Sequence, residues 1–420
     1  MSHQDAFSAV EKNEEYIVEL LRKLIAVDTS VPPGENYEKL IEIMEPEFEK
    51  FGFTNERVIL PDDKVAQMPW DLSGPRTNLV STLKVGDKPL ASAYSHMDVV
   101  PVLDQEWTQD PFGGAVVDGK LYGRGTVDMK YAFACFLGAM KVITEMGLEP
   151  HYSLNFLSCT DEELGVYPGA RYLVEEGYFS PHLLWLELGA MEPIITIGAA
   201  GSIRIDVTSM GKSCHSGMNY LGVNAIEELV PVLNELITLK QEVEKRLSRI
   251  PTFPLPGNPY DKMTPMFNLN IIKAGTKENI VPEECELTIN RRYIIDENYD
   301  DVISEIQDAI ARGKEKSKLL DIKVNVVHSY PPVEVNPECP AIKKVQEAMK
   351  AVKGYEHFLL GGISGSTDLG FVSGHFDGKV DVAGFGVIRA ANILAHAADE
   401  HVYIEDLLSM TKTLVHYICF

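Results

Sequence analysis

The sequence lacks the features that mark secreted, membrane-spanning and disulfide-stabilised proteins. Its six cysteines are scattered over 420 residues without a Cys-x-x-Cys pair, which predicts reduced, buried thiols and no disulfide framework. No run of about 20 apolar residues is present, so we expect no membrane span and no membrane partner. The opening residues MSHQDAFSAVEKNEEY have no basic segment followed by an apolar one. We therefore expect a cytoplasmic protein without a secretory signal.

Positive charge is also scarce. There are 38 Lys and Arg residues against 62 Asp and Glu residues, which gives a formal net charge of −24. Such an excess of negative charge argues against nucleic acid and anionic membrane surfaces as partners. A hydrophobic content of 45% and a charged content of 24% are typical of a soluble globular protein. The length exceeds one ordinary hydrophobic core, so we expect two domains.

Most of the chain alternates between short apolar strands and amphipathic helices. Strands are expected at 55–60, 78–84, 89–96, 152–158, 183–188 and 380–385, and helices at 14–26, 36–50, 131–146, 169–176, 341–352 and 404–418. This alternation predicts an α/β domain with a mixed, mostly parallel sheet and helices on both faces.

The pattern changes near Ala200. Expected strands at 202–208, 267–273 and 285–295 and expected helices at 224–249 and 299–314 surround a Pro-rich loop, 251–259. These elements predict an inserted α+β domain over 201–320. The larger domain then comprises 1–200 and 321–420, and the apolar segment 321–327 fits either domain.

Residues of the metal-ligand type stand at strand ends and loops throughout the α/β part. They are His96 and Asp98, Asp128, Glu162 and Glu163, Glu187, and His396. Each of them alone is most often a solvated loop or a packed residue, but together they are hard to obtain by chance. Ligands collect at the carboxyl ends of strands in open α/β sheets, and imidazole with carboxylate suits zinc. The pattern therefore predicts a metal-dependent hydrolase.

Spacing constrains the roles of these residues. His96 and Asp98 are two positions apart, so they face the same side of a strand, and one can bind metal while the other accepts the ring N–H. Glu162 and Glu163 are adjacent and diverge on an extended chain, which suits one metal ligand and one general base.

The motifs as a set resemble a known family. LLRKLIAVDTSVPPGEN, SHMDVVP, WTQDPFGG, DGKLYGRGTVDMK, TDEELG, NIVPEECELTINRR and AHAADEHV are similar to the motifs of co-catalytic zinc hydrolases, metallopeptidase family 20. That family includes acetylornithine deacetylase, succinyl-diaminopimelate desuccinylase, aminoacylase-1 and glutamate carboxypeptidase. The resemblance covers nearly the whole chain. It implies a zinc-exopeptidase-like catalytic domain and a ferredoxin-like inserted domain that serves as lid and dimerisation domain.

The resemblance also implies a role for each metal-site residue. Asp128 bridges two Zn²⁺ ions, for which Co²⁺ can substitute. His96 and Glu187 complete one metal site, and Glu163 and His396 complete the other. Glu162 is the general base, and Asp98 orients His96.

Further residues are implied to act on the substrate. His215 matches a lid histidine that reaches the partner subunit's active site, which implies a homodimer through the inserted domain. The positions implied to bind a substrate carboxylate are Asn279, Arg291, Arg292, Gly362 and Ser364. Because adjacent strand residues face opposite ways, only one of the two arginines can point inward.

The expected reaction is hydrolysis of the amide bond of a small N-acyl amino acid, of the deacetylase or desuccinylase type, in amino-acid metabolism. A dipeptidase or carboxypeptidase using the same site is the alternative, and Glu rather than Asp at position 187 favours the deacylase. A catalytically silent homologue would lack the base or a ligand, and all are present. The chain departs from the family at Tyr131, Asn219 and 363–366, which leaves the substrate open.

Overall fold

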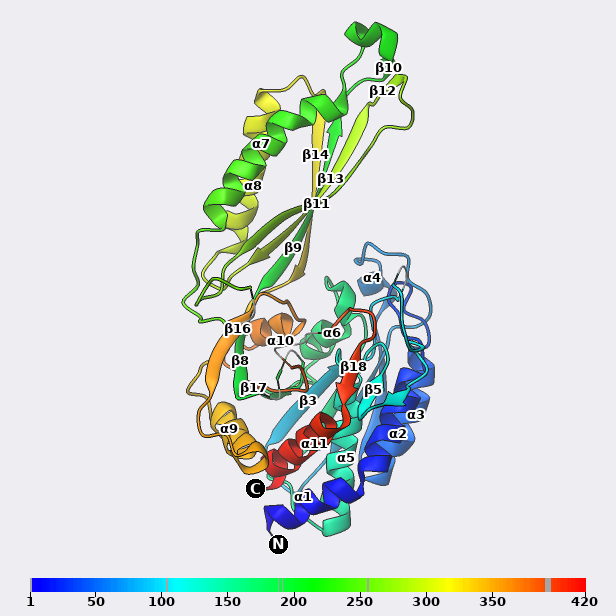
Figure 1. Ribbon diagram of the computed structural model, residues 1–420, viewed down its shortest axis with the longest axis vertical. Helices are drawn as coiled ribbons and strands as arrows, with labels where there is room; N and C mark the ends of the chain where they lie inside the picture. Colours follow the sequence, from blue (N-terminus) through cyan, green and yellow to red (C-terminus); the bar gives the residue numbers. More distant parts are fainter. Residues whose placement is uncertain (1, 103–104, 188, 191, 255–256, 390–393) are drawn as a thin grey trace.

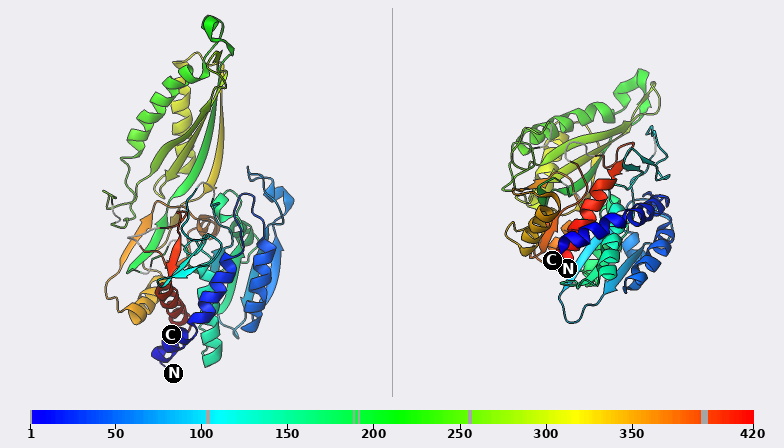
Figure 2. Two further views of the ribbon diagram at one scale, coloured as in Figure 1. Left: turned by 45° about the vertical axis from the view of Figure 1, so that its right-hand side comes forward. Right: turned by 60° about the horizontal axis from the view of Figure 1, so that its bottom comes forward.

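The computed structural model describes residues 2–102, 105–187, 189–190, 192–254, 257–389 and 394–420. Leu188, the last residue of one expected strand, and Pro256 of the expected loop lie outside these ranges. The chain forms a large domain with a smaller domain standing on one end of it (Figure 1). The two chain termini lie close together at the opposite end of the large domain in Figures 1 and 2.

The large domain is built around one mixed sheet with the strand order β1-β2-β6-β3-β7-β17-β8-β15, and β16 pairs with β8. Its central strands β6, β3, β7 and β17 are parallel to one another, whereas β1, β2 and β15 pair antiparallel. The strands are β1 (Thr54–Ile59), β2 (Thr77–Leu83), β3 (Leu90–His96), β6 (Ser153–Cys159), β7 (His182–Trp185), β8 (Ile194–Ala199), β15 (Val333–Glu334), β16 (Leu359–Ile363) and β17 (Asp381–Gly384). This confirms the predicted α/β class with a mixed sheet.

Helices cover this sheet and complete its core. They are α1 (His3–Lys12), α2 (Glu14–Ile25), α3 (Tyr37–Lys50), α4 (Asp62–Val65), α5 (Tyr131–Met146), α6 (Gly169–Glu175), α9 (Pro340–Lys353), α10 (Leu369–His375) and α11 (Ile404–Cys419). Every residue of β6 is buried, and α5 is buried over most of its length between the sheet, α2 and α11. Phe136 of α5 packs 4.7 Å, centroid to centroid, from Phe156 of β6. Burial on both faces explains why these two segments read as continuous apolar runs.

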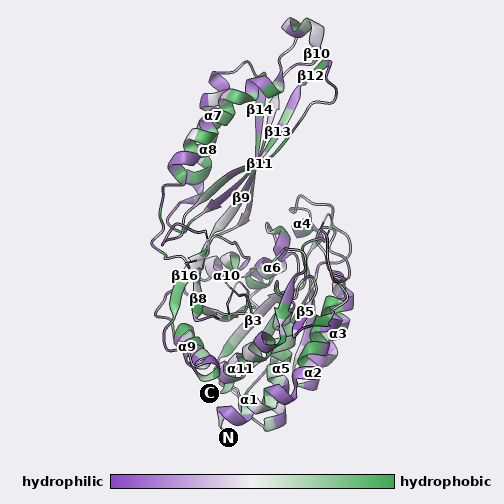
Figure 3. Cartoon of the chain, in the orientation of Figure 1, coloured by the Kyte–Doolittle hydropathy of each residue, from purple (hydrophilic) through white to green (hydrophobic). Residues whose placement is uncertain are grey.

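The small domain has the order of elements β-α-β-β-α-β. Its antiparallel sheet runs β11 (Met266–Ala274), β13 (Glu284–Tyr293), β9 (Gly201–Met210), β14 (Asp321–Tyr330). Helices α7 (Ala225–Val243) and α8 (Tyr299–Glu315) pack on it, and Figure 3 shows polar and apolar residues alternating along both helices. A two-stranded antiparallel sheet of β10 (Cys214–His215) and β12 (Ile280–Val281) lies near the far tip (Figure 1).

The expected domain boundary at residue 320 is wrong by one strand. β14 pairs with β9 from Asp321 to Tyr330, and Ile322, Val324 and Val326 pack against the small domain's core. Strand alternation alone could not decide which sheet this segment joins, because both domains accept such a strand. The chain therefore leaves the large domain at Ala200 and re-enters it at Pro331–Pro332.

The composition predicts no membrane span and no disulfide framework. None of the helices in these ranges is both long and apolar enough to cross a membrane. All six cysteines are free thiols, four of them buried.

Candidate metal centre

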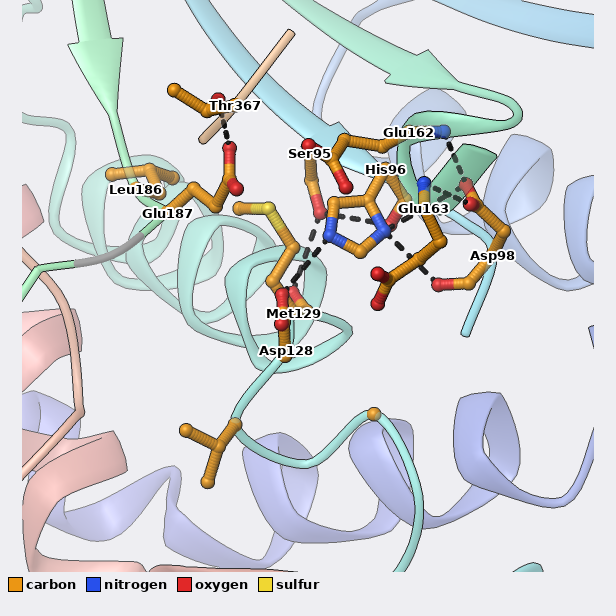
Figure 4. A network of polar contacts seen from close by, with 12 residues as sticks. Ser95, His96, Asp98, Asp128, Met129, Glu162, Glu163, Leu186, Glu187 and Thr367 are labelled. Atoms are coloured by element: carbon orange, nitrogen blue, oxygen red, sulfur yellow. Dashed lines mark hydrogen bonds and ion pairs between the residues drawn. The ribbon is translucent and has the colours of Figure 1, made fainter. Parts of the chain in front are cut away.

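The predicted metal ligands converge at one edge of the central sheet. β3 ends at His96, β6 is followed by the 3₁₀ turn Glu162–Leu164, and β7 is followed by Glu187. Because β6, β3 and β7 are parallel neighbours, their carboxyl ends bring these side chains together. Asp128 enters from the turn before α5 (Figure 4), and His396 enters from the loop before β18 (His401–Tyr403).

Four groups of side chains in the described residues could hold a metal ion, and two of them share the Asp128 carboxylate. His96, Asp128 and Glu187 each offer a ligand atom within 4.8 Å of the others, and so do Asp128, Glu163 and His396. Asp128 Oδ1 lies 3.1 Å from His96 Nε2, and Asp128 Oδ2 lies 3.2 Å from His396 Nε2. His396 Nε2 is also 3.1 Å from Glu163 Oε1. The two oxygens of Asp128 thus face two different histidines, as a bridging carboxylate requires.

The hydrogen-bond partners of His96 fit a metal ion at Nε2. His96 Nδ1 is 3.0 Å from the backbone carbonyl of Asp98, which can only accept, so Nδ1 carries a proton. Nε2 lies 3.1 Å from Asp128 Oδ1, which as a carboxylate oxygen also accepts, so either a proton or a metal ion lies between these two atoms. Burial lowers the pKa of His96, but the hydrogen bond to Asp128 and the charges of Asp98 and Asp128 outweigh it and raise that pKa well above 6.5. Three carboxylates and two imidazoles are a donor set that suits zinc.

Glu162 differs from the five ligands in its surroundings. It is buried, and its Oε1 has no hydrogen-bond partner among the described residues. Burial, followed by the neighbouring charge of Glu187, raises the pKa of Glu162 well above its ordinary value of 4.5. Burial and Asp368 likewise raise the pKa of Glu187 to about 8. A carboxylate with a raised pKa is a stronger base than one in water, and proton transfer needs that property.

Asp98 contributes differently from its expected role. Its carboxylate is 3.7 Å from His96 Nδ1, whereas its backbone carbonyl is the close partner of that ring. The carboxylate instead accepts hydrogen bonds from the backbone N–H groups of Glu162 and Glu163, at 3.2 and 2.9 Å (Figure 4). Asp98 therefore orients His96 through its main chain and holds the turn of the two glutamates through its side chain.

Several residues that support the ligands escaped the sequence reasoning. Glu187 Oε2 accepts hydrogen bonds from Tyr94 at 2.8 Å and from Thr367 at 2.5 Å. The Tyr94 hydroxyl also contacts Asp368, and Tyr330 donates to the backbone carbonyl of Glu162. Tyr94 precedes His96 by two positions on one strand, so it shares a face with the ligand. The two-residue periodicity of the strand was therefore the sequence signal that could have identified Tyr94.

A buried ion pair fixes the loops that carry Asp128 and His396. Glu400 Oε1 accepts hydrogen bonds from the backbone N–H groups of Gly125, Val127 and Asp128, at 3.1, 2.8 and 3.2 Å. Its other oxygen pairs with Arg124 at 2.7 Å, and Arg124 also donates to the carbonyl of His396 at 3.3 Å. One pair of side chains therefore ties the bridging ligand to the last ligand.

The family model of peptidase family M20/M25/M40 matches residues 93–419, a span that contains every one of these ligands. The chain belongs to the M20 family. It is accordingly a metal-dependent hydrolase, and its site holds the candidate ligands for the metal.

Individual relatives of this M20 protein carry several activities in their names. It is 26% identical to an N-formyl-4-amino-5-aminomethyl-2-methylpyrimidine deformylase of Bacillus subtilis, over 97% of this chain and 95% of the relative. It is 29% identical to a probable succinyl-diaminopimelate desuccinylase of Staphylococcus epidermidis, over 80% and 84%. The solved structure of the di-peptidase Dug1p from Saccharomyces cerevisiae shares the fold, with a TM-score of 0.78, 18% identity and coverage of 99% and 98%.

Two predicted substrate residues of the M20 chain lie far from its own metal centre. His215 is exposed in the β10–β12 sheet, and Asn279 lies beside it, where the Asn279 carbonyl accepts from Ser216 N–H at 3.0 Å. This small sheet stands at the end of the small domain that points away from the large domain in Figures 1 and 2. Within one chain these two residues do not reach the ligands.

The two arginines of β13 have different environments. Arg291 is fully buried and pairs with Glu297 at 2.5 Å inside the small domain, so the expectation that it contacts substrate is corrected. Arg292 faces the other way, as strand geometry requires, and donates to Ser366 Oγ at 2.5 Å. Among the described residues, no carboxylate lies within ion-pair distance of Arg292. A half-buried guanidinium without a carboxylate partner is suited to an anionic ligand.

Gly362 and Ser364 belong to the end of β16 and the turn after it. Gly362 is buried, and a Cβ atom at this position would lie 2.1 Å from Met263 Sδ, so a larger residue would have to displace the methionine side chain. Its backbone N–H and carbonyl form hydrogen bonds with Pro251 and Thr252, so a role of Gly362 in substrate binding stays a prediction. Ser364 lines a cavity together with residues of β8 and β16.

Proposed function

We propose that this M20 enzyme hydrolyses the amide bond of N-acyl amino acids that carry a free carboxylate. The observation that carries the proposal is the shared Asp128 between two ligand groups, with Glu162 buried beside them and one of its oxygens unpaired. Two carboxylate-and-imidazole groups with a common bridge and an adjacent base suit the hydrolysis of an unactivated carbonyl.

His96, Asp128 and Glu187 would hold one zinc ion, and Asp128, Glu163 and His396 would hold the other, with Co²⁺ as a substitute. Bound metal ions supply Lewis acidity, which lowers the pKa of water and polarises the scissile carbonyl. Glu162 accepts the proton that the attacking water loses and delivers it to the leaving amine nitrogen as the C–N bond breaks. Its raised pKa favours the first transfer, and its buried position keeps the proton available for the second.

Arg292 gives the substrate its orientation. Its guanidinium holds the free carboxylate, and Ser366 fixes the guanidinium through the 2.5 Å hydrogen bond. A planar guanidinium binds a carboxylate with two parallel hydrogen bonds, which fixes direction as well as position. We further propose a homodimer through the small domain, in which the exposed His215 and its neighbour Asn279 complete the partner subunit's site.

Two observations favour the hydrolysis of N-acyl amino acids over a dipeptidase or carboxypeptidase activity. Two relatives are named as a deformylase and a desuccinylase, enzymes that remove an acyl group, and they align over 80% or more of the chain. The ligand at position 187 is Glu, which also favours a deacylase.

A substrate panel tests the reaction class. N-formyl, N-acetyl and N-succinyl amino acids and unblocked dipeptides are offered to the protein loaded with Zn²⁺ or Co²⁺, and amine release is measured. We expect turnover of blocked amino acids and its loss in Glu162→Gln at unchanged metal content. Cleavage of unblocked dipeptides alone would assign the enzyme to the peptidases.

A further inference from the structure

The described parts of the Pro-rich loop between α7 and β11 contact the large domain at Pro251, Thr252 and Met263. Gly362 N–H donates to the Pro251 carbonyl at 2.8 Å, and the Thr252 hydroxyl donates to the Gly362 carbonyl at 3.1 Å. Met263 packs on Gly362, whose missing Cβ makes room for the sulfur. The loop is thus bound along β16, which lies beneath the small domain in Figure 1. The proposed hydrolytic mechanism assigns no function to these contacts between the loop and β16.

A cavity of about 620 Å³ lies between this loop and the strands β8 and β16. Its walls are mainly apolar and aromatic, with contributions from Phe253, Tyr260, Met263, Ile194, Ile363 and Ile388. Lys262 is the one charged residue among its described lining residues, and it is exposed. Ligand sites in proteins range from about 300 to 1,000 Å³ and are lined in this way. The interior of the cavity favours an uncharged, bulky group.

The cavity is connected to the metal centre and to Arg292 through the segment that follows β16. Gly365 lines it and precedes Thr367, whose hydroxyl bonds the ligand Glu187, by two positions. Two residues of extended chain span at most about 7 Å. Ser366, which lies between them, is the residue that Arg292 contacts. Gly365, one position before the residue that Arg292 contacts, therefore places this part of the cavity wall near a molecule held by Arg292.

We propose that this cavity receives the side chain of the amino-acid half of the substrate, and that this side chain is large and apolar. The inference rests on the proposed function and narrows its substrate class. In an α-amino acid the carboxylate and the side chain branch from the same Cα. Binding of the carboxylate to Arg292 consequently directs the side chain to a neighbouring subsite. The substrates are N-acyl derivatives of aromatic or long aliphatic amino acids.

Binding of the product amino acids tests the cavity without relying on turnover. Calorimetric titration of the zinc-loaded protein with L-phenylalanine, L-leucine, L-alanine and L-aspartate gives four dissociation constants. We expect phenylalanine and leucine to bind at least tenfold more tightly than alanine, because each buried methylene changes affinity severalfold. Equal binding of all four, weaker binding of the apolar pair or no binding at all would overturn the proposal.

Variants that fill the cavity test whether it causes the preference for phenylalanine over alanine. Ile363→Trp places a larger side chain in the cavity wall and should reduce the preference for phenylalanine over alanine at least tenfold. The matched control is Ile272→Trp on β11, where the isoleucine is 56% exposed and outside the lining. It should keep the wild-type preference. Tyr260→Ser, at a lining residue that is 45% exposed, is the second variant should Ile363→Trp fold poorly, and it should also weaken phenylalanine binding. A preference unchanged by the cavity variants would overturn the proposal.

The kcat/KM values for N-acetyl-phenylalanine and N-acetyl-alanine separate this proposal from the reaction itself. Binding preference without any hydrolysis would refute the proposed function and leave the cavity assignment standing. Hydrolysis of both substrates at equal kcat/KM would refute the cavity assignment alone. A parallel series with one amino acid and different acyl groups completes the test. Selectivity that follows only the acyl group would assign the cavity to the other half of the substrate and overturn the proposal.

Discussion

Arg124 and Glu400 form a fully buried ion pair of 2.7 Å between residues 276 positions apart in the chain. Neither residue is a metal ligand, yet Glu400 holds the turn of Asp128 and Arg124 holds the loop of His396. Residues that orient metal ligands in this way contribute about 10–100-fold to metal affinity. The substitution Glu400→Gln should therefore lower zinc affinity by about that factor, measured by competition with a chelating dye.

The same variant should lose about 3–5 kcal/mol of unfolding free energy, because Arg124 remains buried without its counter-ion. The control is Glu405→Gln, which breaks the pair with Arg389 on the surface, where the Glu405 side chain is 70% exposed. An exposed pair contributes about 0–1 kcal/mol, so this variant should unfold like the wild type in urea and keep its zinc affinity. Equal effects of the two substitutions would refute a special role for the buried pair.

Glu162 provides the most direct test of the proton chemistry. Glu162→Gln keeps the size of the side chain and removes its basicity, so kcat should fall by about 10²–10⁴-fold or more. Both metal ions should remain bound, since all five ligands are intact, and metal analysis of the purified variant checks this. A variant that loses metal together with activity would show that Glu162 is a ligand instead of the base.

Local patterns in the sequence predicted most elements of the large domain, because each buried segment carries its own periodicity. The strand at Leu90–His96 and the helix at Pro340–Lys353 lie within one residue of the expected bounds. β14 could not be assigned to a sheet, since its alternation fits either partner. β16 lay hidden in a Gly-rich segment whose strand character comes from pairing with β8.

In the candidate site, too, local patterns predicted some residues, whereas others depend on contacts between distant parts of the chain. The ligands were recognisable because each follows a strand or turn, and the structure brings them together. The roles of Arg291 and Arg292 remained open because strand geometry says that they diverge and not which one points inward. Asp368 was missed because its contact with Tyr94 spans 274 positions and leaves no local pattern.

The two arginines of β13 predict opposite phenotypes. Arg292→Ala removes a charged hydrogen-bond donor worth about 1.5–3 kcal/mol, so KM for carboxylate substrates should rise about 10–100-fold with little change in stability. Arg291→Ala removes one of the two arginines that pair with Glu297, whose side chain is 7% exposed, and leaves Arg246 as the other. The variant should lose about 1.5–3 kcal/mol of stability, the contribution of a charged hydrogen bond, at nearly unchanged KM. Steady-state kinetics and urea unfolding of both variants check this, and an exchange of the two phenotypes would contradict the assignment.

The metal-free protein should become less stable as the pH rises. Burial raises the pKa of Glu187 from 4.5 to about 8 and that of Asp368 from 3.8 to about 7. Hydrogen bonds to Asp128 and Glu163 raise the pKa of His396 from 6.5 to about 10. All three groups hold protons in the folded state that the unfolded chain releases at lower pH. Their contribution to stability is therefore present at low pH and is lost as the pH rises from about 4 to about 10.

Bound zinc should reverse this loss of stability with rising pH, because zinc replaces the protons on the ligand atoms of Glu187 and His396. The rise in the melting temperature on adding Zn²⁺ to chelator-treated protein should accordingly be larger at pH 8 than at pH 6. Thermal unfolding at the two pH values, with and without zinc, measures the difference. Glu187→Gln is the matched control, since an amide does not titrate, and its metal-free form should lose less stability between pH 6 and pH 8 than the wild type. A metal-free wild type that is more stable at pH 8 than at pH 6 would show that these groups do not retain their protons in the folded state.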